Sequence, residues 1–288
     1  MLIIKKLLVP VDFSETSDAA LDYAKYVAGK IGASIEILHI VESYSHNVVL
    51  AGDDSEMDES TNMVQEKLNE IKSKLAGVNV ETTIAAGKIH KEVNKVSESD
   101  RADMIIMGTH GASGIGNLEK YILGSNAYRV VHGSNIPVLT IRDHDPNPGF
   151  KRILLPVDVT KVTDQKVSIA IDWARYFASE VHVVSVTNYF DEFKINLSQQ
   201  KHKLTTIAKE IASKGIHVHS EVLRHESIAT EVLNYSKDSG SDLIIILKSQ
   251  ETKWNELFVG SAARKIISEA HTPVMSIRPQ QMTNGTQG

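Results

Sequence analysis

The chain has 288 residues, a hydrophobic content of 42% and a charged content of 23%, values typical of a folded globular protein. Its formal net charge of -5 argues against a general nucleic-acid binder, because such proteins carry a basic face. It has no cysteine, which excludes disulfides, thiolate metal sites and cysteine nucleophiles. We expect neither a signal peptide nor a membrane helix, and therefore a cytoplasmic protein.

Short apolar runs alternate with helical patterns along the first half of the chain. Runs of this length, bounded by Gly, Asp or Pro, are typical of strands buried on both faces of a parallel sheet. The runs are Leu7–Val11, Ile35–Val41, Val80–Ala85, Met104–Met107 and Val138–Ile141. Residues at helical spacing between them predict covering helices, for example Ala20, Ala24, Val27 and Ala28, and then Val64, Leu68, Ile71 and Leu75.

The second half of the chain repeats the first. Leu7–Asp12 recurs as Ile153–Asp158 at an offset of 146 residues, and Leu21–Ala28 recurs as Ile171–Ala178 at 150. Ala102–Ile106 recurs as Ser241–Ile245 at 139, and Gly124-Ser125 recurs as Gly260-Ser261 at 136. Four matches in the same order predict two copies of one domain, with insertions and deletions in the connections.

A proline stands in the first predicted strand of each copy. Pro10 and Pro156 each remove a hydrogen-bond donor from the sheet. Because both lie near the end of their run, we interpret them as the points where the strands end beside a ligand crevice.

The alternation of strands and helices predicts a doubly wound α/β architecture, with right-handed crossovers and a parallel sheet between helices. We predict a first domain over residues 1–143, a linker rich in Pro and Gly over 144–150, a second domain over 151–279 and a flexible polar tail over 280–288. Ligands of such sheets bind beyond the carboxyl ends of the strands, where the strand order reverses. The residues directly after each strand are therefore the candidates for function.

A glycine-rich segment follows the fourth predicted strand of the first copy. It holds Gly108, Gly111, Gly114 and Gly116, and Gly124 then opens the next helical pattern. Glycine lets backbone amides approach phosphate oxygens, and a helix start attracts anions. Glycines also shape tight turns without any ligand, so it is the position directly beyond a buried strand that favours a phosphate site.

Asp12 follows the first predicted strand, and Ser14 is a natural N-cap for the helix after it. In dinucleotide-binding folds, a carboxylate at a strand end accepts hydrogen bonds from a ribose. Capping of the helix is an equally good interpretation of Asp12 when this residue is taken alone.

Together these residues resemble the universal stress protein family, over nearly the whole chain and once per copy. The resemblance rests on Pro10-Val11-Asp12, the glycine segment, the closing Pro137-Val138 and the partial repetition of these features in the second copy. It implies a five-stranded parallel sheet of the adenine-nucleotide α-hydrolase type in each copy. It also implies that the fifth strands, at Ile141 and Ile277, pack the copies as an intramolecular pseudo-dimer.

One branch of that family is marked by Gly-x2-Gly-x9-Gly-(Ser/Thr) and binds ATP. The resemblance implies that Asp12 and Gly108 contact the ribose, that the backbone at the end of the second strand frames the adenine, and that the later motif positions hold the phosphates. With their neighbours, the predicted ligand residues are Pro10, Val11, Asp12, Ile40, Val41, Met107, Gly108, His110, Gly111, Gly124, Ser125 and Asn126. The implied cofactor is ATP, with or without Mg²⁺.

Both copies depart from this motif. In the first copy, twelve residues instead of nine separate Gly111 from Gly124. The second copy keeps the spacing of nine but has Leu247 and Gln250 at the first two glycine positions. A leucine there obstructs the approach of a ribose to the backbone, so we expect the first copy to bind nucleotide and the second copy not to.

We expect a nucleotide-binding sensor of the stress response rather than an enzyme, with self-association of the two copies and a further homodimer left open. The sequence has no Walker lysine, Gly-x-Ser-x-Gly elbow or His-x-Gly-His signature. Two alternatives stay open. One is a nucleotide-free interaction protein with vestigial loops, and the other is a slow ATPase or autophosphorylating protein that uses Ser113 or Ser125.

Other polar residues favour plainer interpretations. His217 and His219 alternate on one predicted strand with His225 just beyond, but no ligand spacing completes a zinc site, so we expect the strand pair to face solvent. For His110, a role in shaping the loop is favoured over contact with a phosphate. The acidic cluster at residues 53–59 lacks the spacing of a calcium loop, and we interpret it as a solvated loop or a lid before the Val64 helix.

Overall fold

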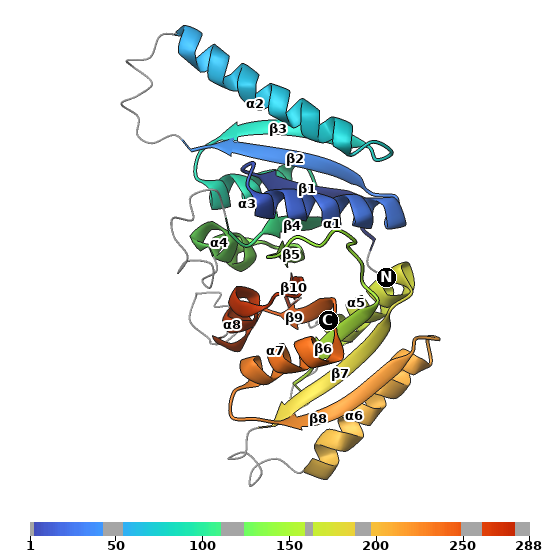
Figure 1. Cartoon of the computed structure of the whole chain (residues 1–288). Coiled ribbons are helices and arrows are strands. Elements are labelled where there is room, and N and C mark those ends of the chain that lie inside the picture. The colour runs from blue at the N-terminus through green and yellow to red at the C-terminus, as the bar shows by residue number, and fades with distance from the viewer. Residues whose placement is uncertain are drawn as a thin grey trace, which may run out of the picture. The chain divides into compact units, whose positions relative to one another are not determined.

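The computed structural model describes residues 3–42, 54–110, 124–158, 164–187, 197–248 and 261–279, with side chains from residue 61 onward in the second range. The chain divides into two compact units, Ile3–Gly149 and a second that begins at Phe150. Figure 1 shows the same alternation of strands and helices in each unit.

The described strands of the first unit form a parallel sheet in the order β3-β2-β1-β4-β5. Its elements are β1 Lys6–Val11, α1 Glu15–Ile31, β2 Ser34–Val41, α2 Asp54–Lys74, β3 Val80–Ala86, α3 Ile89–Ser99, β4 Met104–Gly108, α4 Ser125–Gly133 and β5 Val138–Ile141. The predicted α/β fold with a parallel sheet and tandem domains is confirmed.

The second unit repeats this topology, with its described strands in the order β8-β7-β6-β9-β10. Its elements are β6 Arg152–Pro156, α5 Asp164–Phe177, β7 Glu180–Thr187, α6 Leu197–Ala212, β8 Val218–Arg224, α7 Ile228–Ser239, β9 Leu243–Leu247, α8 Ser261–Glu269 and β10 Val274–Ile277. Within the described ranges of both units, no helix is long and apolar enough to cross a membrane.

Local signals explain where several helices begin and end. Ser14 caps α1 by accepting a hydrogen bond from the N–H of Ser17, and the helix ends at Gly32, whose φ of 74° is left-handed. Ser227 and Gly240 play the same two roles around α7. The N-cap role predicted for Ser14 is confirmed.

A carboxylate ties the start of the first strand to the start of the fourth strand in both units. Asp103 accepts hydrogen bonds from two successive backbone N–H groups at 2.7 and 3.0 Å. Asp242 does the same at 2.8 and 2.9 Å. Since both acids bind backbone, the repeated Asp before the fourth strand has a structural role in each copy.

The two cores use different side chains for the same helix–sheet packing. In the second unit, Phe150, Trp173 and Phe177 form a cluster with ring centroids 4.8 to 5.5 Å apart. Such aromatic packing adds to the free energy gained from burial. The matched positions of the first unit hold smaller buried residues: Ile4, Tyr23 and Val27.

The acidic cluster is not the loop that the sequence suggested. α2 begins at Asp54, so the acidic residues that follow it belong to the first turns of the helix. Negative side chains are favourable there because a helix start carries partial positive charge. Asp53 lies outside the described residues.

The two prolines mark strand ends to different degrees. Pro156 is the last residue of β6, whereas β1 continues past Pro10 to Val11 and pairs with β2 over that length. On its other side, β1 pairs with β4 at Leu7 and Leu8, before the proline. Pro10 is compatible with a strand because the pairing of β1 with β4 ends before this residue, so the missing N–H is not needed there.

Candidate functional site

The strand order of the first unit reverses between β1 and β4, which end at Val11 and Gly108. A doubly wound sheet opens a crevice at such a point, because the crossovers on its two sides lead away in opposite directions. Among the predicted residues, Pro10 and Val11 end β1, Asp12 follows it, and Met107 and Gly108 end β4. The fold therefore brings both predicted ribose contacts to one edge of the sheet.

Hydrogen bonds connect the end of β1 to the segment that follows β4. Asp12 Oδ1 accepts from the backbone N–H of Ser14 at 3.1 Å and from its hydroxyl at 2.5 Å. The Ser14 hydroxyl lies 3.1 Å from Thr16 Oγ1, which donates to the carbonyl of His110 at 2.5 Å. The first turn of α1 thus fixes the Asp12 carboxylate relative to the loop that leaves β4.

Gly108 and Gly124 stand where a side chain has no room. A Cβ on Gly108 would lie 2.9 Å from Thr16 Cβ and 3.0 Å from the backbone carbonyl carbon of Thr16. A Cβ on Gly124 would lie 2.9 Å from the carbonyl oxygen of Thr109, which accepts the N–H of Gly124 at 2.9 Å. Packing alone therefore requires both glycines, whatever ligand binds beside them.

The predicted phosphate end is the start of α4. The helix begins at Ser125 with Gly124 as its N-cap, and among the described residues no side chain makes a capping hydrogen bond. Ser125 is exposed and Asn126 is half-buried. A helix start of this kind presents backbone N–H groups and partial positive charge to an anion.

Three cations act on His90, which neighbours the start of α4, and we call Lys88, Lys91 and Arg129 the cationic rim. The pKa of His90 is lowered chiefly by burial, and then by the positive charges of Arg129, Lys91 and Lys88. A side-chain hydrogen bond between this imidazole and Asn126 acts on the His90 pKa in the opposite direction. The positive field of the rim therefore reaches the first turn of α4, where an anionic ligand would be stabilised.

The predicted adenine positions end β2. Ile40 is half-buried, and Val41 is exposed with its carbonyl accepting the N–H of Gly87 at 3.0 Å. Phe13, whose φ of 62° is left-handed, stacks on His39 with ring centroids 4.6 Å apart. The turn after β1 is thus held against β2 by a pair of rings.

Two predicted residues belong to the loop after β4. His110 Nδ1 lies 2.8 Å from Thr109 Oγ1, and its carbonyl accepts from Thr16, so the residue shapes the start of the loop. Gly111 lies outside the described residues, as do the two extra glycines that follow it.

The matching edge of the second unit holds two buried lysines. Lys166 is 6% exposed and donates to the carbonyl of Pro156. Burial lowers the pKa of Lys166 to about 8, although the charge of Asp158 acts in the opposite direction. Lys248 is also 6% exposed, and burial, followed by the charge of Arg278, lowers its pKa to about 8.

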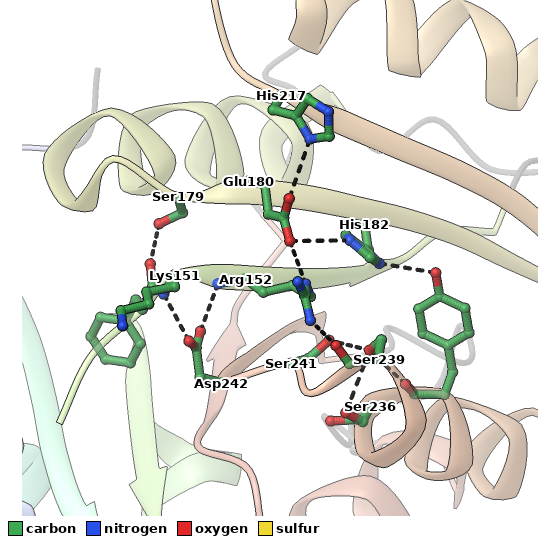
Figure 2. Close-up of polar contacts among 12 residues, drawn as sticks. Lys151, Arg152, Ser179, Glu180, His182, His217, Ser236, Ser239, Ser241 and Asp242 are labelled. Atoms are coloured by element: carbon green, nitrogen blue, oxygen red, sulfur yellow. Dashed lines mark hydrogen bonds and ion pairs between the residues drawn. The ribbon is translucent and has the colours of Figure 1, made fainter. Parts of the chain in front are cut away.

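The opposite, amino-terminal edge of the second unit carries a polar network, shown in Figure 2. Arg152 donates to Glu180 and to the carbonyl of Ser239. Glu180 also lies 3.6 Å from His182 and 3.2 Å from His217. The hydrogen bond from Arg152 is the main reason that the pKa of Glu180 is lowered.

The histidine pair of the second unit lies at the surface, as expected. The His217 and His219 side chains are 81% and 51% exposed, and each faces a carboxylate. His225 has a different role, because its ring accepts the N–H of Ser227 at 2.9 Å and shapes the turn before α7. Within the described part of the chain, no three acidic or histidine side chains are grouped as metal ligands.

Sequence reasoning missed three residues that the structure makes prominent. Thr16 is in the first turn of α1, and its contact with Gly108 depends on how that helix packs on β4. His90 gains its surroundings only because α3 lies beside α4. Lys166 had a signal in the sequence, since the offset of 150 aligns this lysine with Thr16.

Comparison with known proteins places both halves of the chain in one group. Residues 4–142 and 149–278 each match the Universal stress protein family. A universal stress protein of Methanocaldococcus jannaschii is 33% identical over 156 residues, which cover 48% of this chain and 94% of that protein. A universal stress protein of Mycolicibacterium smegmatis is 23% identical over 295 residues, covering 95% and 97% respectively.

A solved structure shows the same two-domain fold. The crystal structure of a universal stress protein from Archaeoglobus fulgidus matches with a TM-score of 0.76 and 24% identity. The match covers 96% of this chain and 97% of that chain.

Proposed function

The chain belongs to the universal stress protein family, in two tandem copies, and on this premise we propose that its first copy binds ATP or a similar adenine nucleotide. Binding serves regulation in the stress response, and the second copy is a nucleotide-free structural partner. The observation that carries the proposal is the cationic rim around the start of α4, at the edge of the sheet where Asp12 also lies.

The second copy lacks most of this rim. At the positions of Lys88 and Lys91 it has Ser227 and Thr230, both neutral. At the position of Arg129 it has Lys265, which donates to the hydroxyl of Thr230 at 3.0 Å. A triphosphate carries several negative charges, so its binding is favoured at the first copy.

The residues at the ribose end also fit a nucleotide. Ser14 orients the Asp12 carboxylate, a group that accepts hydrogen bonds from ribose hydroxyls. Gly108 ends β4 and adds no side-chain atoms of its own at this edge of the sheet. Phosphates at the start of α4 would meet backbone N–H groups and the rim, with Mg²⁺ as their counter-ion.

Calorimetric titration of nucleotide-stripped full-length protein with ATP and Mg²⁺ tests the proposal, and we expect one site per chain. Ser125→Glu places a carboxylate at the start of α4, where it favours the helix but repels a phosphate. We expect at least about a tenfold loss of affinity, corresponding to ~1.4 kcal/mol, with an unchanged fold.

The matched control is Ser261→Glu at the first residue of α8, an exposed position of the second copy. It should leave affinity and stoichiometry unchanged. Absence of binding to the unmodified protein would contradict the proposal, and a loss only in Ser261→Glu would assign the site to the other copy. Gly124→Val is a poorer test, because its Cβ would press on the Thr109 carbonyl and disturb the fold.

A second candidate is a nucleotide-free interaction protein. The observation in its favour is that Gly108 and Gly124 are both explained by backbone packing. The twelve-residue spacing between Gly111 and Gly124 also departs from the ATP-binding motif. If millimolar ATP neither binds nor raises the melting temperature, this alternative replaces the nucleotide proposal.

A further inference from the structure

Lys166 stands in the second copy where Thr16 stands in the first, by the offset of 150 that relates α1 to α5. Thr16 has a short side chain whose hydroxyl reaches the loop after β4. Lys166 is long and 6% exposed, and its ammonium donates to the carbonyl of Pro156, the last residue of β6. The ammonium therefore lies at the carboxyl end of the central strand.

The ammonium of Lys166 also acts on the acid that a ribose would need. Asp158 follows β6 as Asp12 follows β1, and its negative charge stabilises the charged form of Lys166. Burial of an ammonium costs free energy unless it is paired and hydrogen-bonded. A ligand that displaced Lys166 from the Pro156 carbonyl would leave the buried ammonium without that hydrogen bond.

The strand β9 carries a larger residue at its end than β4 does. Leu247 ends β9 at the position where Gly108 ends β4. In the first copy, even a Cβ at residue 108 would contact Thr16 at 2.9 Å. In the first copy α1 and β4 meet closely at Thr16 and Gly108. The second copy has larger side chains at both matched positions, Lys166 on α5 and Leu247 on β9.

We propose that Lys166 and Leu247 close the second crevice to nucleotides. Lys166 binds the strand end at the Pro156 carbonyl as an internal ligand and places its charge near Asp158, and Leu247 adds a side chain where the first copy has glycine. This inference rests on the proposed function, because the second crevice is called closed by comparison with a first crevice that binds nucleotide. It makes these two residues the barrier to entry in the second copy, separate from the charge that the rim supplies in the first.

Restoring the residues of the first copy tests the inference. Lys166→Thr combined with Leu247→Gly should add a second ATP site in calorimetric titration of the full-length protein, weaker than the first because Ser227 and Thr230 replace two cations of the rim. Adding Ser261→Glu should weaken the new site at least tenfold and leave the original site unchanged. Lys209→Thr, at an exposed lysine of α6, is the matched control and should leave the stoichiometry at one.

The reverse substitution decides the question if the double variant does not fold. Thr16→Lys introduces the long cation beside Asp12 and should lower the ATP affinity of the first copy at least tenfold. Circular dichroism confirms that the fold is retained. Retention of full affinity in folded Thr16→Lys would overturn the inference.

The outcomes separate this inference from the proposed function. One site in both the unmodified protein and a folded double variant contradicts the closure alone. No site in the unmodified protein and one in the double variant supports the closure and contradicts nucleotide binding by the first copy. No binding by either protein contradicts both.

Discussion

The two copies place positive charge at different depths of the same edge of the sheet. In the first copy Lys88, Lys91 and Arg129 are exposed around the start of α4. In the second copy Lys166 and Lys248 are buried. A cation at the surface can receive an anionic ligand, whereas a buried cation already has its partners inside the protein. A positively charged residue near such an edge therefore indicates an anion site only when its side chain is known to be exposed.

The amino-terminal edges of the two sheets differ in a similar way. Glu36, 2% exposed, pairs with Lys6 at 2.9 Å and accepts from Thr83 at 2.8 Å. The matched residue of the second copy is His182, which contacts Glu180 at 3.6 Å. The same position thus holds a paired acid in one unit and a histidine in the other.

The largest effect is expected from the core of the second unit. Trp173→Ala removes a fully buried side chain that contacts Phe150 and Phe177, and should lower the free energy of unfolding by about 3–5 kcal/mol. Urea unfolding followed by circular dichroism measures it. Tyr23→Ala is the matched change in the first unit, which lacks the aromatic cluster, and should cost less. Equal losses would mean that the cluster adds no special stability.

A smaller effect concerns pH and belongs to the second unit. Burial is the main cause that lowers the pKa of His182 below its usual 6.5. In the unfolded chain this histidine binds a proton more readily than in the folded chain. The contribution of His182 to the free energy of unfolding is therefore constant well above pH 6.5 and decreases as the pH drops below it. His182→Gln should reduce the loss of stability between pH 7.5 and 5.5, measured by urea unfolding at both values. An unchanged loss would assign the pH dependence to other groups.

The smallest effect is expected on the pKa of His90 in the first copy. The second copy has Ala229 at this position. Bound phosphates offset the charges of Lys88, Lys91 and Arg129, which hold down the pKa of His90 together with burial. Saturating ATP should therefore raise this pKa, as measured by NMR titration of the imidazole. An unchanged His90 in protein shown to bind ATP would place the phosphates away from the rim.

Periodicity and repetition in the sequence were enough to predict the strands and the tandem copies, and a local signal predicted the N-cap of one helix. Ser14 could be predicted because a cap depends on residues within one turn of the helix. The start of α2 could not, since an acidic segment suits a solvated loop and a helix start equally well.

The parts of the site that depend on packing between elements were not predictable. Gly108 suggested a ligand, whereas its closest neighbour is Thr16 on α1. The repeat aligns Lys166 with Thr16, a difference that the sequence shows, but the burial of Lys166 depends on how α5 lies on β6. Nucleotide contacts at Asp12, Gly108 and the start of α4 stay predictions that binding experiments must test.

The contact between Gly108 and Thr16 also limits how two such copies can diverge after a duplication. A side chain at residue 108 meets the backbone of Thr16 at 3.0 Å, so the strand end cannot change while the helix keeps its place. Lys166 follows Asp158 by eight positions, whereas Thr16 follows Asp12 by four. The connection before α5 is therefore four residues longer than the one before α1. A leucine at the end of β9 therefore goes together with a change in the connection that positions the helix beside it.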